Sequence, residues 1–161
     1  YAHAEMLAEG CPVFLVNTVG VNHSCAFLKE NRCAIYAARP RACRMYPFSV
    51  IPSQAGKRFQ YYQCLDAHSD HFSGENVCAR DWIRENLNSE DRIFLEKEAG
   101  YMARLGNLLH RAGLNRQKEW LFSILFYRYY NYDLEQPFLA QYERNHKELL
   151  NRLSRNVQKE M

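Results

Sequence analysis

The sequence predicts a mainly α-helical protein, in which an irregular cysteine-rich section with short strands packs on a C-terminal bundle of about four helices. All six cysteines lie within the first 78 of the 161 residues, and helical hydrophobic spacing dominates after them. The chain has only 7 glycines and 5 prolines, fewer than a β-sandwich with many tight turns would need. We therefore divide the chain into a cysteine-rich section, residues 1–74, and a helical section, residues 75–161.

Local signals predict the elements of the cysteine-rich section. Residues 1–9 have the composition of the last turns of a helix, and a glycine follows them as a stop. Residues 13–19 and 59–63 are rich in β-branched and aromatic side chains and predict two strands. Pro40 is expected to start a one-turn helix over residues 41–45, because proline suits a first helical position.

Four helices are expected in the helical section. The first covers residues 75–87, Ser89 caps a second over 90–112, and a third covers 115–132. Pro137 opens the fourth helix, which continues to the end of the chain. The residues that share one face of this last helix at 3.6-residue spacing are Phe138, Leu139, Tyr142, His146, Leu149, Leu150, Leu153 and Val157.

Composition and missing motifs narrow the function classes. No run approaches 18 consecutive apolar residues, so no membrane-spanning helix is expected. The net charge of +3 is mild, and we do not expect nucleic acid as a partner. The glycine-rich nucleotide-binding motifs and the common protease and hydrolase motifs are absent.

Four cysteines form the strongest candidate site. They follow the spacing C-x7-C-x9-C, and twenty residues separate the third cysteine from the fourth. Four thiolates from separate loops can form a tetrahedral zinc site or hold an iron–sulfur cluster. The candidate ligands are Cys25, Cys33, Cys43 and Cys64. Because six is an even number, three disulfide bonds remain an alternative.

The remaining cysteines and the loop histidines are weaker candidates. Cys11 and Cys78 are expected to be ordinary buried cysteines. The imidazoles of His23, His68 and His71 could also bind a metal, although loop histidines are more often polar surface.

Basic side chains surround the candidate ligands. Residues 29–58 contain seven basic residues and one acidic residue, a net charge of +6. Guanidinium groups would offset the charge of a four-thiolate centre and lower the pKa values of the thiols. The alternatives are a phosphate-binding patch and a solvated basic surface. We expect Arg39 and Arg44 to lock the loops by donating to thiolates or backbone carbonyls.

An aromatic run stands out in the helical section. Its members are Phe122, Phe126, Tyr127, Tyr129, Tyr130 and Tyr132, and Trp120, Ile124 and Leu125 continue it at helical spacing. Packing in the core or between helices is favoured over a ligand-binding surface.

The segment CAFLKENRCAIYAARPRACRMYPF, residues 25–48, resembles the YkgJ-like family of zinc- or iron-chelating domains. The family signature reads C-x-F-L, then C-x-I-Y-x-x-R-P-x-x-C-R, then an aromatic residue, proline and phenylalanine. The positions in register besides the cysteines are Tyr36, Arg39, Pro40, Arg44, Pro47 and Phe48. The resemblance covers about 40 residues, from Cys25 to Cys64.

The resemblance implies a bound zinc ion or iron–sulfur cluster, structural or redox-active, in a bacterial cytoplasm. It implies no settled reaction, so whether the protein is an enzyme stays open. Flagellin lysine methylases carry a similar cysteine cluster, and an iron–sulfur-dependent protein-modifying enzyme is therefore one alternative. A subunit that docks to a protein partner or larger complex is another.

The sequence departs from the family pattern at the front. The family carries an early C-x2-C-x2-C-C run, whereas only Cys11 precedes Cys25 here. We expect the missing run upstream of Tyr1, in a partner chain, or replaced by a substitute ligand. His23 is the candidate substitute, since it stands two residues before Cys25 where the family usually has glycine.

Overall fold

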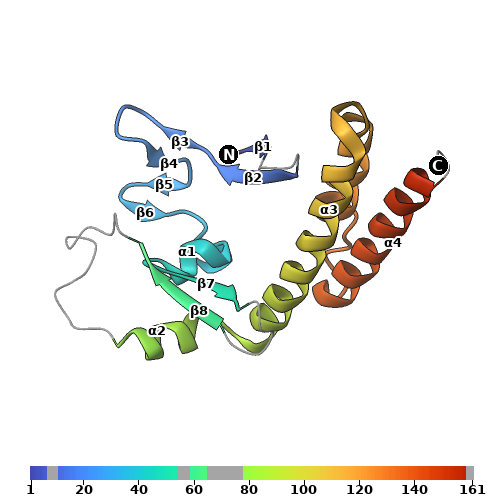
Figure 1. The fold of residues 1–161 in the computed structure, drawn as a ribbon. Helices are drawn as coiled ribbons and strands as arrows, with labels where there is room; N and C mark the ends of the chain where they lie inside the picture. Colours follow the sequence, from blue (N-terminus) through green and yellow to red (C-terminus); the bar gives the residue numbers. More distant parts are fainter. Residues whose placement is uncertain (7–10, 54–58, 65–77, 159–161) are drawn as a thin grey trace. The chain divides into compact units, whose positions relative to one another are not determined.

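The computed structural model of the protein describes residues 1–6, 11–53, 59–64 and 78–158 (Figure 1). The chain forms two compact units, one made of Tyr1–Leu28 with Gly100–Met161 and the other of Lys29–Ala99. The predicted fold class is confirmed, because helices dominate and the strands are short. The predicted section boundary after residue 74 lies outside the described residues. None of the described helices is long and apolar enough to cross a membrane.

A β-hairpin opens the first unit, and the predicted helix over residues 1–9 is wrong. Strand β1 (Ala2–Met6) pairs antiparallel with β2 (Pro12–Val16) over five residue pairs, while residues 7–10 lie outside the described part. The side chain of His3 hydrogen-bonds to Asn17, 14 residues away. These cross-strand interactions are non-local, so they override the helical propensity of the first residues. The predicted strand over residues 13–19 is divided into β2 and β3 (Thr18–Val19).

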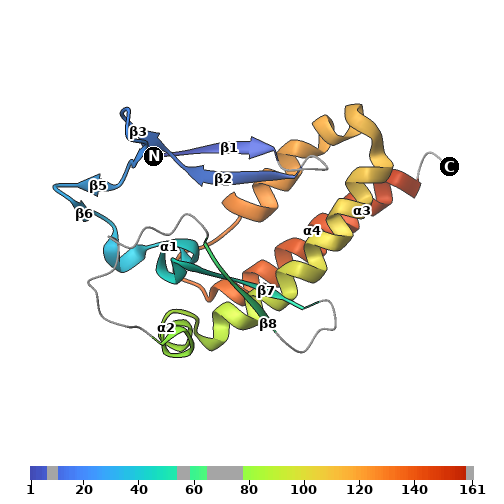
Figure 2. The same cartoon turned by 60° about the vertical axis from the view of Figure 1, so that its left-hand side comes forward.

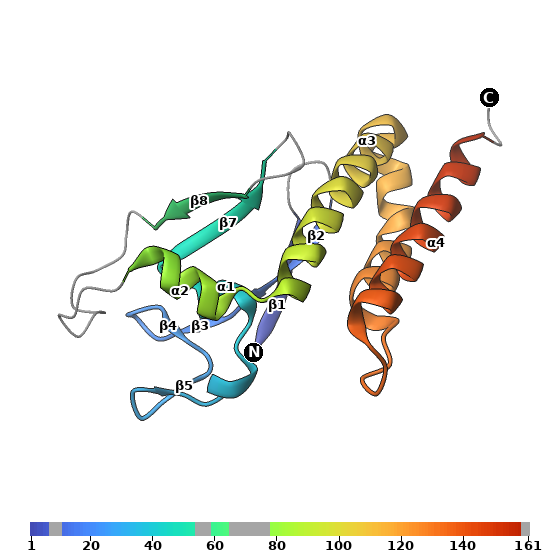
Figure 3. The same cartoon turned by 90° about the horizontal axis from the view of Figure 1, so that it is seen from below.

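Helix α3 (Ser89–Leu125) turns back on itself near its middle. The amide Nε2 of Gln117 donates to the carbonyl of Leu109 at 2.9 Å. In a straight helix, eight residues span about 12 Å, which a glutamine side chain cannot bridge. Figures 2 and 3 show the reversal where the ribbon passes from yellow to orange. The predicted break after residue 112 is thus a change of direction within one continuous helix.

A π-helical turn and a long helix complete the first unit. The turn covers Phe126–Tyr130, and the N–H of Asn131 donates to the carbonyl of Phe126 at 2.9 Å. Helix α4 (Phe138–Gln158) follows, as its hydrophobic spacing predicts. Pro137 directly precedes it, in agreement with the expected start.

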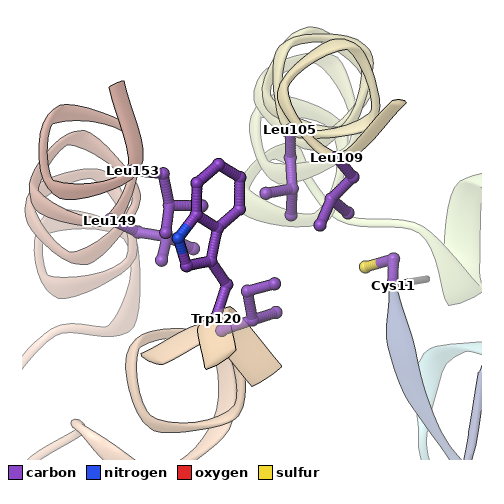
Figure 4. Packing of buried hydrophobic residues seen from close by; sticks show 7 residues of the cluster. Cys11, Leu105, Leu109, Trp120, Leu149 and Leu153 are labelled. Atoms are coloured by element: carbon purple, nitrogen blue, oxygen red, sulfur yellow. The ribbon is translucent and has the colours of Figure 1, made fainter. Parts of the chain in front are cut away.

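The core of the first unit lies between the two arms of α3 and α4. Leu105 and Leu109 come from the arm of α3 before the turn, and Trp120 and Ile124 come from the arm after it (Figure 4). Helix α4 contributes Leu149 and Leu153, and β2 is preceded by Cys11, which also packs in this core. Leu105 and Trp120 are fifteen residues apart in sequence, so their packing together requires the turn in α3.

Buried polar side chains hold the connection into α4. Asn145 exchanges two hydrogen bonds with Asn131, at 2.6 Å and 3.0 Å. His146 donates through Nδ1 to the carbonyl of Tyr142 at 3.1 Å and accepts from Arg128 Nη1 at 2.8 Å. These bonds satisfy polar groups that would otherwise destabilise the buried face of α4.

The aromatic run at the end of α3 and in the π-helical turn only partly follows its predicted role. Trp120 and Ile124 are buried, and Tyr127 packs against the core. Phe122 and Tyr130, however, are 77% and 65% exposed. Packing is therefore confirmed for one face of the run and wrong for these two rings.

The described part of the second unit combines short strands with short helices. Helix α1 (Arg41–Met45) starts directly after Pro40, and β8 (Phe59–Gln63) pairs antiparallel with β7 (Phe48–Pro52). Helix α1 and strand β8 were predicted, whereas β7 was not. Helix α2 (Ala79–Asn86) is the described part of the helix predicted over residues 75–87. The small core consists of Met45, Ile83 and Leu87, with Phe48, Val50 and Leu95 packed against it.

Candidate metal centre

Cys25 lies on a tight hairpin of the first unit. Strand β4 (Ser24–Cys25) pairs with β3 through the register Thr18↔Cys25. The connecting turn contains Gly20 and His23, both with positive φ, of 71° and 49°. This turn leaves the side chain of Cys25 exposed to solvent.

Cys33 lies on the next hairpin, at the end of β6 (Arg32–Cys33), which pairs with β5 (Leu28–Lys29). Glu30 and Asn31 form the two-residue turn, with φ angles of 49° and 58°. Two successive positive φ angles are typical of a type I′ turn, which fits the twist of a two-stranded hairpin. Cys33 is partly buried.

Cys43 and Cys64 are carried by neighbouring elements of the second unit. Cys43 is the middle residue of α1, and its side chain is exposed. Cys64 directly follows β8, and its N–H donates to the carbonyl of Pro47 at 2.8 Å. The pairing of β7 with β8 therefore returns the chain at Cys64 to the segment that leaves α1.

Arginines near these cysteines contact a carboxylate, backbone carbonyls and an aromatic ring. The guanidinium of Arg44 reaches both carboxylate oxygens of Asp91, at 3.0 Å and 3.2 Å, and donates to the carbonyl of Asn86. Arg41 lies 3.7 Å from the same carboxylate. Arg39 stacks over the ring of Tyr36 at 3.8 Å and donates to its carbonyl at 3.2 Å. The expected locking of loops through backbone carbonyls is confirmed for Arg39 and Arg44.

Sequence reasoning missed Asp91, which has two roles. Its backbone N–H donates to Oδ1 of Asn88 at 2.8 Å, which caps α3, while its carboxylate pairs with Arg41 and Arg44. The N-cap is thus Asn88, one residue before the predicted Ser89. The spacing of Asn88 and Asp91 is that of a capping box, which was the signal available in the sequence.

The two cysteines outside the candidate set differ in environment. Cys11 is 3% exposed and packs in the core of the first unit, so its expected burial is confirmed. Cys78 is exposed at the position preceding α2, so its expected burial is wrong. Its carbonyl accepts the N–H groups of Asp81 and Trp82, which places it at the start of the helix.

The donor chemistry fits a thiophilic metal, but the described residues do not bring three donors together. Sulfur ligands suit zinc and iron–sulfur clusters. Among the described residues, no group of three histidine, cysteine, aspartate or glutamate side chains is placed to hold a metal ion. His23 is described, whereas His68 and His71 lie outside the described part. The structure joins no two of the six described cysteines by a disulfide bond.

Comparison with known proteins places the front of the chain in context. Residues 3–79 match the CxxCxxCC family, described as "Putative zinc- or iron-chelating domain". The matched segment contains all six cysteines. No curated protein and no solved structure matches the chain. The resemblance found in the sequence is thereby confirmed, and the match supports metal binding by this chain.

Proposed function

From the match of residues 3–79 to the zinc- and iron-chelating CxxCxxCC family, we propose that this chain is a cysteine-ligated metal-binding protein. The proposed ligands are Cys25, Cys33, Cys43 and Cys64, and the metal is a zinc ion or the iron of an iron–sulfur cluster. The family match is the observation that carries the proposal.

The small size of the β-structure supports a structural role for the metal. The described strands form four separate two-stranded sheets. A single two-stranded hairpin is marginally stable in water, and within the described part of the second unit the buried core consists of three residues. Metal ligation contributes folding free energy directly, so it would stabilise elements that bury little apolar surface.

Three of the four proposed ligands lie on elements with defined local structure. Cys25 and Cys33 lie on hairpins closed by positive-φ turns, and Cys43 lies on a helix fixed by Arg44. Elements held in this way lose less conformational entropy when a metal is bound. Three of the four proposed ligands are exposed, which leaves their sulfur atoms accessible.

The charge around the proposed site is smaller than the sequence count implies. Arg41 and Arg44 share the carboxylate of Asp91, so part of the net positive charge of residues 29–58 is already offset. Lys29 and Arg32 lie on the same hairpin as Cys33 and form no ion pair among the described side chains. These two cations would offset thiolate charge at Cys33.

Metal counting on anaerobically purified full-length chain tests the proposal. Zinc, iron and acid-labile sulfide are counted per chain, and an absorption spectrum near 400 nm distinguishes an iron–sulfur cluster from colourless zinc. A cluster would favour the alternative of an iron–sulfur-dependent modifying enzyme. Zinc without sulfide would favour a structural site.

Matched variants assign the ligands. We expect Cys43→Ser and Cys64→Ser to lose the metal, and Cys78→Ser, an exposed thiol outside the proposed set, to retain it. Metal-free wild-type protein, or full metal content in all three variants, would overturn the proposal.

A second role, as an interaction subunit, is favoured by the exposed rings of the first unit. Phe122 and Phe126 stack with centroids 6.4 Å apart, and Phe14 meets Tyr130 edge-on at 6.2 Å. Exposed aromatic clusters mark protein interaction sites more often than isolated rings do. If Phe122→Ser leaves the mass of the native assembly unchanged in light scattering and that mass is a monomer, this second role is not supported.

A further inference from the structure

A groove runs along the first unit between α3 and α4, far in sequence from the cysteines. Two adjoining hollows of about 570 Å³ and 420 Å³ form it. Both are lined by Arg104 of α3 and by Leu150 and Asn151 of α4, so they are continuous. The first hollow has the size of a typical small-molecule site.

The lining of this groove is strongly basic. Its cationic members are Arg104, Arg111, Arg144 and Lys147, against the single carboxylate of Glu143. None of the four cations forms an ion pair with a described carboxylate within 4.0 Å. Like charges gathered around one hollow repel one another, and a bound anion would relieve this repulsion.

The donors are of the kind that recognise phosphate. Three of the four cations are arginines, whose planar guanidinium groups bind phosphate oxygens in pairs. Neutral donors stand between them: Asn107, Asn151 and Ser154 line the second hollow. Charged and neutral donors at one concave surface together can satisfy several oxygens of one ligand.

Helix geometry keeps these donors along one line. The α3 residues from Tyr101 to Arg111 span about 15 Å, and the α4 residues from Arg144 to Ser154 span the same length. Tyr101 of α3 and Arg144 of α4 line the first hollow, and Arg111 and Ser154, which come later in the same two helices, line the second. This part of α3 therefore runs in the same direction as α4 (Figure 1). Core residues Leu105, Leu109 and Leu149 on the inner faces of both helices hold this spacing.

We propose that the groove between α3 and α4 is a binding site for a small phosphorylated ligand, held by Arg104, Arg111, Arg144 and Lys147. The groove shares no lining residue with the proposed metal centre, because every lining residue belongs to the helical part of the first unit. Its loss would therefore leave the metal content unchanged.

Titration of the metal-loaded full chain with inorganic pyrophosphate tests this proposal. Calorimetry gives the affinity, and amide chemical shifts locate the site at residues 101–111 and 143–154. We expect the double variant Arg104→Gln/Arg144→Gln to bind pyrophosphate about tenfold more weakly or worse, since each arginine contributes charge-assisted hydrogen bonds. The control is Arg152→Gln/Arg155→Gln, which removes the same charge from exposed α4 positions outside the groove and should change the affinity less than twofold.

Three results would overturn the proposal. Equal weakening in both double variants would show an effect of net charge alone. Unchanged affinity in the groove variant would place pyrophosphate elsewhere, including on the bound metal. Binding of a single-stranded oligonucleotide without binding of pyrophosphate would make the groove a nucleic-acid surface. Circular dichroism of both variants confirms that the helices are intact.

Discussion

The Nη2 atom of Arg44 lies 3.0 Å and 3.2 Å from the two carboxylate oxygens of Asp91. This contact joins α1, which carries Cys43, to the first turn of α3. The Asp91 side chain is 14% exposed and that of Arg44 is 31% exposed, so water screens the pair only in part. The position of one proposed metal ligand thus depends on an ion pair 47 residues apart in sequence.

Breaking this pair should destabilise the second unit. We expect Arg44→Gln to lower the free energy of unfolding by about 1–3 kcal/mol, because it leaves a partly buried carboxylate with weaker partners. Urea denaturation followed by circular dichroism measures the change. The control is Arg84→Gln, which breaks the exposed pair of Arg84 and Asp81 and should cost less than about 0.5 kcal/mol. Equal losses in the two variants would contradict a special role for Arg44.

Cys11 should behave as a core residue and not as a ligand. Cys11→Ser places a hydroxyl among Leu105, Leu109 and Trp120, and we expect it to destabilise the first unit by about 1–3 kcal/mol. Metal content per chain should stay at the wild-type value. Thermal melting and elemental analysis of the same preparation measure both effects. Loss of the metal from folded Cys11→Ser protein would be the contrary result.

The polar contact between Asn145 and Asn131 should be needed for the start of α4. Asn145→Ala removes two hydrogen bonds in a site that is 1% exposed, and we expect a loss of about 2–3 kcal/mol. Denaturant unfolding measures it. As a control, Asn151→Ala on the exposed face of α4 should change stability by less than about 0.5 kcal/mol. An unchanged free energy of unfolding in Asn145→Ala would mean that water replaces the lost hydrogen-bond partners.

His3 should titrate above its ordinary pKa. Its hydrogen bond to Asn17 and then its contact with Glu5 raise the pKa of His3 from 6.5. A raised pKa in the folded state means that the interaction stabilises the β1–β2 hairpin fully below pH 6.5, and that this contribution is lost as the pH rises through the folded pKa. Proton NMR of the imidazole measures the shift. In Asn17→Ala the pKa of His3 should fall toward 6.5, and an unchanged value would show that Asn17 is not the main cause.

Patterns that depend on near neighbours were predictable from the sequence. The 3.6-residue spacing gives α4, and Pro40 marks the start of α1. The buried positions Tyr142, Leu149 and Leu153 follow from the same spacing, although Phe138 on the predicted face is half exposed. The side chain of Val157 lies outside the described part.

Features that depend on distant contacts were not predictable. Strand β1 forms because β2 lies opposite it, and composition alone gives no sign of that partner. The units likewise combine Tyr1–Leu28 with residues from Gly100 onward, a grouping that packing decides. For the candidate metal centre, the sequence supplied the cysteines and the resemblance that the match over residues 3–79 confirms, whereas the set of ligands around a metal stays a prediction.

X-ray absorption at the metal edge of anaerobically purified wild-type protein tests the central claim most directly, because it counts the atoms bound to the metal. We expect sulfur neighbours at about 2.3 Å, four of them for a zinc site formed by Cys25, Cys33, Cys43 and Cys64. An iron site should add the sulfide and iron neighbours of a cluster. A first shell made only of nitrogen and oxygen at about 2.0–2.1 Å would contradict a cysteine-ligated metal.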